Sequence, residues 1–208
     1  MQFKDKFYKI YIITGEESGE NIILNILKRL IMHQNIKLYG IGSKRMHNFG
    51  MKPLFSYTEL SMMGLLEILP KIPKIYSLIN QITSDIKIVK PDLIISVDAP
   101  DFSFRVLKKV KKQAQEIKNL HIVAPTVWAW KPDRAKKISN FLDNLFVLYP
   151  FEKKYFTKYK INTHFIGHPL LDSRKDRVKS NIDRKLISIY PGSRKKEILF
   201  HLDKILTV

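Results

Sequence analysis

Asp98 is the residue of this chain whose type and position most favour acid–base chemistry. It follows a short apolar run, LIISV at residues 93–97, and Pro100 comes two residues later. Proline has no N–H group and restricts the residue before it to extended or turn conformations, so we expect a strand that ends at Asp98. Open α/β sheets bind ligands at the carboxyl ends of their strands. Asp98 is therefore a candidate base, with a helix cap, by Asp98 or Asp101 on a helix beginning near Ser103, as the alternative.

A second polar turn, GEESGE at residues 15–20, follows the first apolar run of the chain. A glycine turn that opens a helix exposes backbone N–H groups to a ligand. The turn lacks the lysine and the glycine spacing of nucleotide-binding loops, and its three glutamates would repel a bound pyrophosphate. Gly15, Ser18 and Gly19 are candidate ligand contacts, and Ser18 as a simple helix N-cap is the alternative.

Both tryptophans of the chain lie in one segment, APTVWAWKP at residues 124–132. The aromatic faces of Trp128 and Trp130, with Lys131 and Arg134 beside them, suit a sugar ring or an acyl chain next to a phosphate. The alternative is that the two rings pack this loop onto the core.

The turn PGSR at residues 191–194 resembles a phosphate site at a helix N-terminus, and an ordinary surface turn is the alternative. No cluster of histidine and carboxylate residues has convincing metal spacing. His164 and His168 are four residues apart but straddle a strand end and a glycine, so we expect no metal site.

Residues 61–76 are too apolar for an ordinary solvated helix, and Lys71 and Lys74 lie at their end. We expect Pro70 and Pro73 to break the segment into short pieces. It either lies on a membrane surface or is buried between domains.

These candidate residues can form one site only in a fold that brings the ends of several strands to the same edge. Apolar runs alternate with helical patterns, which predicts a parallel α/β sheet. The predicted strands are residues 9–14, 37–41, 93–97, 120–123, 144–148 and 164–166. We expect an N-terminal Rossmann-like domain over residues 1–168. Residues 169–208 then form a linker and, from a strand at 186–190, the start of a second domain that is cut short.

The composition limits the class of protein. The 208 residues are 45% apolar and include no cysteine, which excludes disulfides and thiolate metal sites and fits the cytoplasm. No apolar run reaches the roughly 18 residues of a spanning helix. The net charge of +18 favours phosphates as ligands, unless the lysines only solvate the surface. We expect no nucleic acid partner, because no known nucleic-acid-binding pattern occurs.

Seven motifs, in this order, are similar to those of the lipid-A-disaccharide synthase family, which are inverting glycosyltransferases with the two-domain GT-B architecture. The motifs are GEESGE at 15–20, MG at 63–64 with Glu67, KPDLIISVDAPDF at 90–102, VWAW at 127–130, LYPFE at 148–152, FIGHP at 165–169 and PGSR at 191–194. The resemblance implies a GT-B-type Rossmann-like domain with a parallel sheet, followed by a truncated UDP-sugar-binding domain.

The family condenses UDP-2,3-diacylglucosamine with 2,3-diacylglucosamine 1-phosphate and releases UDP. The resemblance implies that Asp98 is the catalytic base and that Arg194 stabilises the leaving diphosphate. It implies no metal and no cofactor, since the UDP-sugar is a substrate. The implied substrate contacts are Gly15, Ser18, Gly19, Met63, Trp128, Trp130, Gly192, Ser193 and Glu197.

The resemblance also implies an acylated glucosamine phosphate acceptor, an anionic membrane surface and a place at the inner face of the inner membrane. We expect this chain to be inactive alone. The missing donor domain is either supplied separately, absent because the chain is truncated, or lost from a degraded reading frame. The alternatives are a non-catalytic lipid- or membrane-binding remnant and another GT-B enzyme that acts on a soluble substrate.

Overall fold

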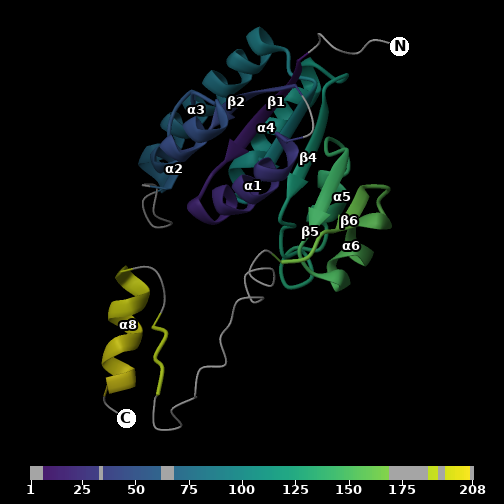
Figure 1. Cartoon of the computed structure of the whole chain (residues 1–208). Helices are drawn as coiled ribbons and strands as arrows, with labels where there is room; N and C mark the ends of the chain where they lie inside the picture. Colours follow the sequence, from purple (N-terminus) through teal and green to yellow (C-terminus); the bar gives the residue numbers. More distant parts are fainter. Residues whose placement is uncertain (1–6, 33–34, 62–67, 169–186, 192–194, 207–208) are drawn as a thin grey trace. The chain divides into compact units, whose positions relative to one another are not determined.

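The computed structural model describes residues 7–32, 35–61, 68–168, 187–191 and 195–206. The chain divides into two units, Met1–Asp172 and Ser173–Val208, and each is described by itself (Figure 1). Among the described residues, no helix combines the length and the apolar character that crossing a membrane requires.

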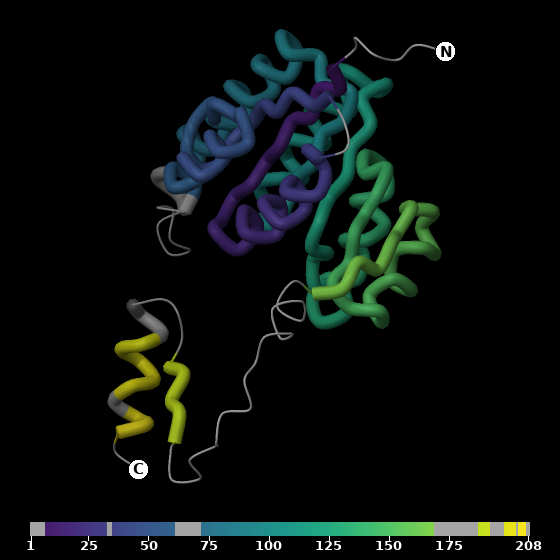
Figure 2. Tube along the Cα trace, viewed as in Figure 1, coloured from purple at the N-terminus to yellow at the C-terminus, as the bar shows by residue number. Residues whose placement is uncertain are grey.

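The first unit is built on one six-stranded parallel sheet with the strand order β2-β1-β3-β4-β5-β6, which confirms the predicted fold class. The strands are β1 (Tyr8–Thr14), β2 (Ile36–Ile41), β3 (Leu93–Val97), β4 (Lys118–Ile122), β5 (Asn144–Val147) and β6 (Asn162–Phe165). Figure 2 shows how the chain runs from β1 to β2 and then crosses to the other side of β1 for β3. The strand order therefore reverses between β1 and β3, the point at which open sheets form a ligand crevice.

Helices cover both faces of this sheet. On one face α1 (Glu17–Leu30) and the 3-10 helix η1 (Lys44–Phe49) bury residues such as Ile23 and Met46 against Ile12 and Val97. The opposite face carries α3 (Ile68–Val89), α4 (Pro100–Gln113), α5 (Arg134–Ile138) and α6 (Lys153–Thr157). Figure 1 shows α1 in front of the sheet and α4 behind it. Because both faces are covered, β3 is apolar almost throughout.

The short elements α2 (Thr58–Ser61) and η2 (Pro150–Glu152) complete the described part of the first unit. In the second unit the structure describes α8 (Lys195–Leu206). The strand predicted at residues 186–190 is not formed at residues 187–190, and residue 186 lies outside the described residues. A strand needs a hydrogen-bonded neighbour, and the other element described in this unit is a helix.

The prediction that prolines break residues 61–76 is wrong for their described part. α3 begins at Ile68 and continues through Pro70 and Pro73 to Val89. Pro70 falls in the first turn, where a backbone N–H has no partner inside the helix. Pro73 removes one hydrogen bond, but the helix continues for sixteen residues beyond it.

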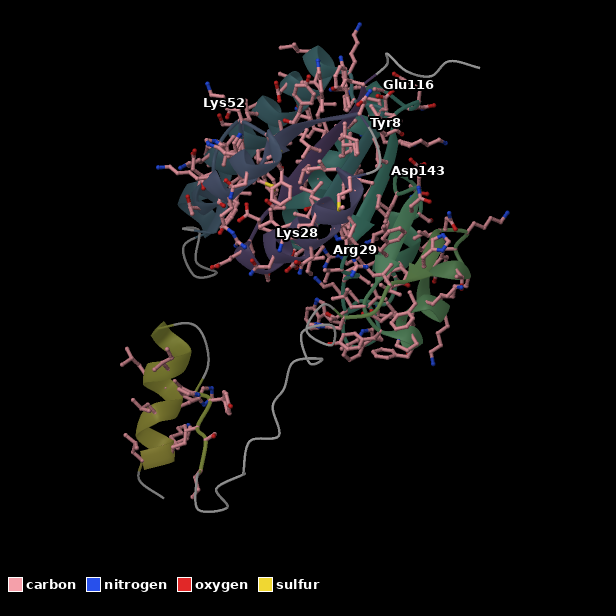
Figure 3. All side chains as sticks on the ribbon, in the orientation of Figure 1. Tyr8, Lys28, Arg29, Lys52, Glu116 and Asp143 are labelled. Atoms are coloured by element: carbon pink, nitrogen blue, oxygen red, sulfur yellow. The ribbon has the colours of Figure 1, made fainter. Side chains whose placement is uncertain are left out.

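The amino edge of the sheet is closed by polar groups that satisfy one another. The backbone N–H of Asn119 donates to Asp143 Oδ2 at 3.0 Å, and the backbone N–H of Asp143 donates to Asn119 Oδ1 at 3.0 Å. Lys111 Nζ lies 2.9 Å from Asp143 Oδ1. Figure 3 shows Asp143 on the same side of the unit as Tyr8, the first residue of β1. These bonds hold β4 and β5 in register at this edge.

Candidate functional site

Asp98 lies directly after β3, in backbone that L-residues rarely adopt. Its φ angle is 56° and that of Ala99 is 42°. Each left-handed residue costs about 1–2 kcal/mol, so the surrounding structure must enforce this turn. The Asp98 N–H donates to the Ile122 carbonyl at 3.0 Å, and Ser103 Oγ donates to the Asp98 carbonyl at 3.0 Å.

The helix-cap interpretation of Asp98 and Asp101 is wrong. α4 begins at Pro100 and not near Ser103, because proline is well suited to the first position of a helix. The N-cap residue is Ala99, which has no capping side chain. The carboxylate of Asp98 turns back instead, and its Oδ1 accepts a hydrogen bond from the Ala99 N–H at 2.8 Å.

The glycine turn after β1 lies against this strained turn. A Cβ atom on Gly15 would lie 2.3 Å from the Cβ of Ala99, and one on Gly19 would lie 2.9 Å from the Val97 carbonyl oxygen. Ordinary side chains therefore do not fit at either glycine. The close approach lets Ser18 Oγ donate to Asp98 Oδ2 at 2.8 Å.

Ser18 is thus a partner of Asp98 and not a helix cap. The N-cap of α1 is Glu16, and Ser18 is the second residue of the helix. Ser18 is exposed and Asp98 is partly exposed, so a ligand can reach both. An ionised carboxylate has about four acceptor positions, and Ser18 and Ala99 use one on each oxygen of Asp98. Acceptor positions remain on both oxygens for the proton of an incoming hydroxyl.

The three glutamates of the turn do not act alike, which corrects the expectation that all would repel a pyrophosphate. Glu16 and Glu17 are exposed, but Glu20 is fully buried. Its Oε1 accepts the Ser43 N–H at 2.6 Å and its Oε2 accepts Ser43 Oγ at 2.7 Å. Glu20 therefore holds the loop after β2 on α1, and two acidic side chains face solvent at the turn.

The tryptophan segment follows β4 and Val123, a strained residue with a φ angle of 78°. Trp128 is 45% exposed and Trp130 is 65% exposed, so neither ring packs the loop onto the core. Val127 and Ala124 fill that role, since both are buried. The two rings are available to a ligand.

Trp128 belongs to an aromatic cluster that spans the ends of three strands. Its ring lies 5.4 Å from that of Phe151, which stacks on Tyr149 at 5.8 Å. Tyr149 lies 5.8 Å from the ring of His168. Phe151 and Tyr149 are each nearly half exposed. This exposed apolar surface suits an acyl chain or the face of a sugar.

Trp130 instead borders a hollow of about 420 Å³ between the first turn of α4 and the start of α5. The residues that line the hollow are Asp101, Trp130, Lys131, Asp133, Arg134 and Lys137. Arg134 Nη2 lies 2.7 Å from Asp101 Oδ1. The sequence did not indicate Asp101, Asp133 or Lys137 as site residues, although Asp101 lies soon after the end of β3.

Tyr149, Phe151 and His168 were also missed as site residues. Their positions in the sequence could have indicated them, because each follows the end of a predicted strand just as Asp98 does. Nothing in the sequence alone indicated that these side chains would gather with Trp128.

His121 lies in β4 behind the turn and is fully buried. Its Nδ1 is 2.7 Å from Ser96 Oγ, and its Nε2 has no hydrogen-bond partner among the described residues. Burial lowers the pKa of His121 to about 3. The ring is therefore neutral at pH 7 and structural, packed edge-on against Phe104 at 4.5 Å.

Four predicted site residues lie outside the described residues: Met63, Gly192, Ser193 and Arg194. Glu197 lies in the first turn of α8. The structure brings Gly15, Ser18 and Gly19 to Asp98, and it places Trp128 and Trp130 in the loop after the neighbouring strand. Within the described ranges, no three histidine or carboxylate side chains gather as they would around a metal ion.

Comparison with known proteins identifies relatives of the chain. The model of the lipid-A-disaccharide synthetase family matches residues 10–208. The lipid-A-disaccharide synthase of Rickettsia felis is 42% identical over 203 residues, which cover 93% of this chain and 52% of that protein. The enzyme of the same name from Rhodospirillum centenum is 36% identical, with 91% of this chain and 50% of that protein covered. The chain spans about half the length of these relatives.

Solved structures share the fold at low identity. The UDP-N-acetylglucosamine 2-epimerase of Rickettsia bellii superposes with a TM-score of 0.56 at 14% identity, covering 80% of this chain and 46% of that one. The UDP-GlcNAc 2-epimerase of Neisseria meningitidis, solved with UDP-GlcNAc, gives 0.55 at 16% identity, covering 79% and 48%. These similarities support the architecture alone.

Proposed function

The chain belongs to the lipid-A-disaccharide synthase family, and from this membership we propose that it is the acceptor-binding half of a lipid A glycosyltransferase. The reaction joins UDP-2,3-diacylglucosamine to 2,3-diacylglucosamine 1-phosphate and releases UDP. The observation that carries the proposal is the Asp98 carboxylate, oriented by Ser18 and Ala99 at the point where the strand order reverses.

Asp98 takes the proton of the acceptor 6-hydroxyl as that oxygen attacks the anomeric carbon of the donor. The bond to UDP breaks on the opposite face of the sugar, so one base suffices and no covalent intermediate forms. Proton transfer to a positioned carboxylate contributes about 10²–10⁴-fold to such reactions. The Ser18 hydroxyl and the Ala99 N–H keep the carboxylate from rotating away from the acceptor.

The last residues of this chain contribute to the donor site, where UDP is stabilised. We place Arg194 and Ser193 at the leaving diphosphate, where a guanidinium group and a hydroxyl can neutralise the developing charge. Gly192 and Glu197 belong to the same donor site. In this proposal the reaction needs no metal and no cofactor.

The acceptor carries acyl chains, so the site must meet a membrane. The described part of the apolar segment leaves Ile72 37% and Tyr76 53% exposed on α3, while Lys74 lies 3.6 Å from Glu59 Oε2 in an ion pair. The exposed apolar side chains suit the surface of a bilayer. We place the protein at the inner face of the inner membrane, where its net charge of +18 meets anionic headgroups.

A disaccharide-forming assay tests the function. Radiolabelled acceptor and UDP-diacylglucosamine are incubated with the chain, with the separately expressed second half of the Rickettsia felis relative, and with both. We expect product only from the mixture, and at least about 100-fold less with Asp98→Asn. Glu116→Gln, an exposed carboxylate at the other edge, is the matched control. Undiminished turnover by Asp98→Asn would remove Asp98 from catalysis.

The same assay distinguishes the proposed function from its two alternatives. A folded chain that binds vesicles but gives no product in any mixture would favour a non-catalytic lipid-binding protein. Turnover of a soluble UDP-sugar and a soluble acceptor would favour another GT-B activity.

A further inference from the structure

We propose that the hollow beside Trp130 binds a phosphate monoester, with Arg134 as its principal ligand. Resting on the proposed function, this phosphate is the anomeric phosphate of the acceptor.

The charge of the hollow favours an anion. Three cationic side chains line it against two carboxylates. Within the described part of the chain, Lys131 and Lys137 form no ion pair, and the Lys131 ammonium lies 5.1 Å from the Trp130 ring centre. A phosphate that enters the hollow therefore finds two ammonium groups outside any ion pair, and the three cations of the lining exceed its two carboxylates, Asp101 and Asp133, by one charge.

Arg134 is held in place to receive such a group. Its side chain is 25% exposed, and its guanidinium carbon lies 5.6 Å from the ring centre of the buried Phe104. Among the described residues, Asp101 is its hydrogen-bonding partner, through one of the five N–H groups that a guanidinium carries. The remaining N–H groups of the guanidinium can donate to two phosphate oxygens at once.

Asp101 is a weak competitor for that guanidinium. Its side chain is 88% exposed, and exposed ion pairs contribute about 0–1 kcal/mol. A doubly charged phosphate monoester displaces it at little cost. Until then Asp101 keeps Arg134 directed along the first turn of α4.

The backbone of the loop adds a further constraint. Lys131 has a φ angle of 51° and is followed by Pro132, so a strained residue and a rigid one fix the position of Trp130. Its exposed ring offers an apolar face to a sugar whose phosphate lies in the hollow.

The position of the hollow agrees with the proposed chemistry. Asp101 is three residues beyond Asp98, in the first turn of α4. The acceptor carries its phosphate on C1 and its nucleophilic hydroxyl on C6, so it needs one group to hold it and another to activate it. Arg134 and Asp98 lie on neighbouring segments at one edge of the sheet and divide these tasks.

Binding of glucosamine 1-phosphate to the full chain, measured by calorimetry, tests the inference without any turnover. We expect Arg134→Gln to weaken binding at least about tenfold, because a charge-assisted hydrogen-bonding group is lost. Arg134→Lys, which keeps the charge but not the fork, should fall between this variant and the parent. Asp101→Asn should tighten binding, since it removes the competing carboxylate. Circular dichroism verifies that each variant is folded.

Arg29→Gln is the matched control, because Arg29 is an exposed arginine in the last turn of α1, which leads to the amino end of β2. Equal weakening by Arg29→Gln and Arg134→Gln would overturn the site, because binding would then follow total charge. Unchanged binding by Arg134→Gln would overturn it as well.

Two further binding measurements distinguish a sugar phosphate from a lipid headgroup as the ligand of Arg134. Vesicles of phosphatidylglycerol should bind parent and Arg134→Gln equally, and a loss confined to vesicles would assign Arg134 to the membrane surface instead. Methyl glucosaminide, which lacks the phosphate, should not bind detectably. Undiminished turnover by Asp98→Asn, which would remove Asp98 from catalysis, leaves this binding result untouched, so the two proposals fail independently.

Discussion

The two edges of the sheet in the first unit are built from similar residue types and differ in what those residues do. At the amino edge, Asn119, Asp143 and Lys111 satisfy one another by hydrogen bonds and an ion pair. At the carboxyl edge, Asp98 is fixed by two donors and keeps acceptor positions that face solvent. The first arrangement stabilises the strands, and the second leaves a carboxylate that a ligand can reach.

The backbone shows the same difference. Residues with positive φ occur at both edges, but Lys90 and Lys160 at the amino edge follow α3 and α6, where a left-handed residue is an ordinary helix end. Asp98, Ala99 and Val123 follow strands directly, and no helix end explains their conformation. Backbone strain next to a reachable carboxylate is typical of a functional site.

Glu20 is the strongest challenge to this comparison, because it is a structural carboxylate near the carboxyl edge. We expect Glu20→Ala to lower the free energy of unfolding by about 2–3 kcal/mol, since the Ser43 N–H loses its partner. Urea denaturation measures the change. Glu17→Ala, an exposed neighbour on the same helix, should stay within about 0.5 kcal/mol of the parent. Equal effects would mean that the burial of Glu20 is not what stabilises the loop.

The contact between Gly15 and Ala99 is the closest approach between the two turns that build the carboxyl edge. Gly15→Ala places two Cβ atoms 2.3 Å apart, and such overpacking costs about 1–3 kcal/mol. Ala99→Gly removes one of those atoms and relieves a left-handed alanine, so the double variant should recover most of the stability and the activity. Strictly additive losses in the double-mutant cycle would show that the glycine turn does not lie on Ala99.

The buried His121 predicts a pH dependence. Its pKa is lowered to about 3 in the folded state, so between pH 3 and pH 6.5 the unfolded chain binds a proton that the folded chain does not. The free energy of unfolding should therefore fall as the pH decreases through this range, by about 1 kcal/mol per pH unit. His121→Gln should flatten the curve, and His47→Gln, an exposed histidine, should not. Identical slopes in the parent and His121→Gln would place the titration elsewhere.

Among these variants, Ser18→Ala should have the smallest effect. Ser18→Ala removes one hydrogen bond to Asp98, and we expect turnover of the reconstituted enzyme to fall about tenfold. Because Ser18 is exposed, the free energy of unfolding should change by less than about 0.5 kcal/mol. A loss of stability larger than the loss of activity would make Ser18 a structural residue.

The sequence predicted the sheet well where both faces of a strand are apolar. β3 was predicted to the residue, whereas β4 begins two residues earlier than expected. The difference arises at Asn119, a polar residue that looks like loop but is buried because Asp143 and the Phe141 carbonyl satisfy it. Such pairing partners, more than twenty residues away, leave no local pattern.

The candidate site was predictable in its parts and not in its contacts. Strand ends and glycine turns indicated Asp98, Gly15 and Ser18, and the structure joins them. The left-handed Ala99 could not be foreseen, because this conformation favours glycine or asparagine over alanine. The burial of Glu20 and the pairing of Arg134 with Asp101 depend equally on tertiary contacts that no spacing reveals.

Our proposal is that the carboxyl edge carries the chemistry and the amino edge carries the stability. It is tested most directly by comparing Asp98→Asn with Asp143→Asn in the same reconstituted assay and the same urea denaturation. We predict that Asp98→Asn loses at least about 100-fold in turnover while its unfolding free energy stays within about 1 kcal/mol of the parent. Asp143→Asn should keep its turnover and lose about 1–2 kcal/mol of stability. Turnover that survives in Asp98→Asn, or falls equally in both variants, would contradict the account.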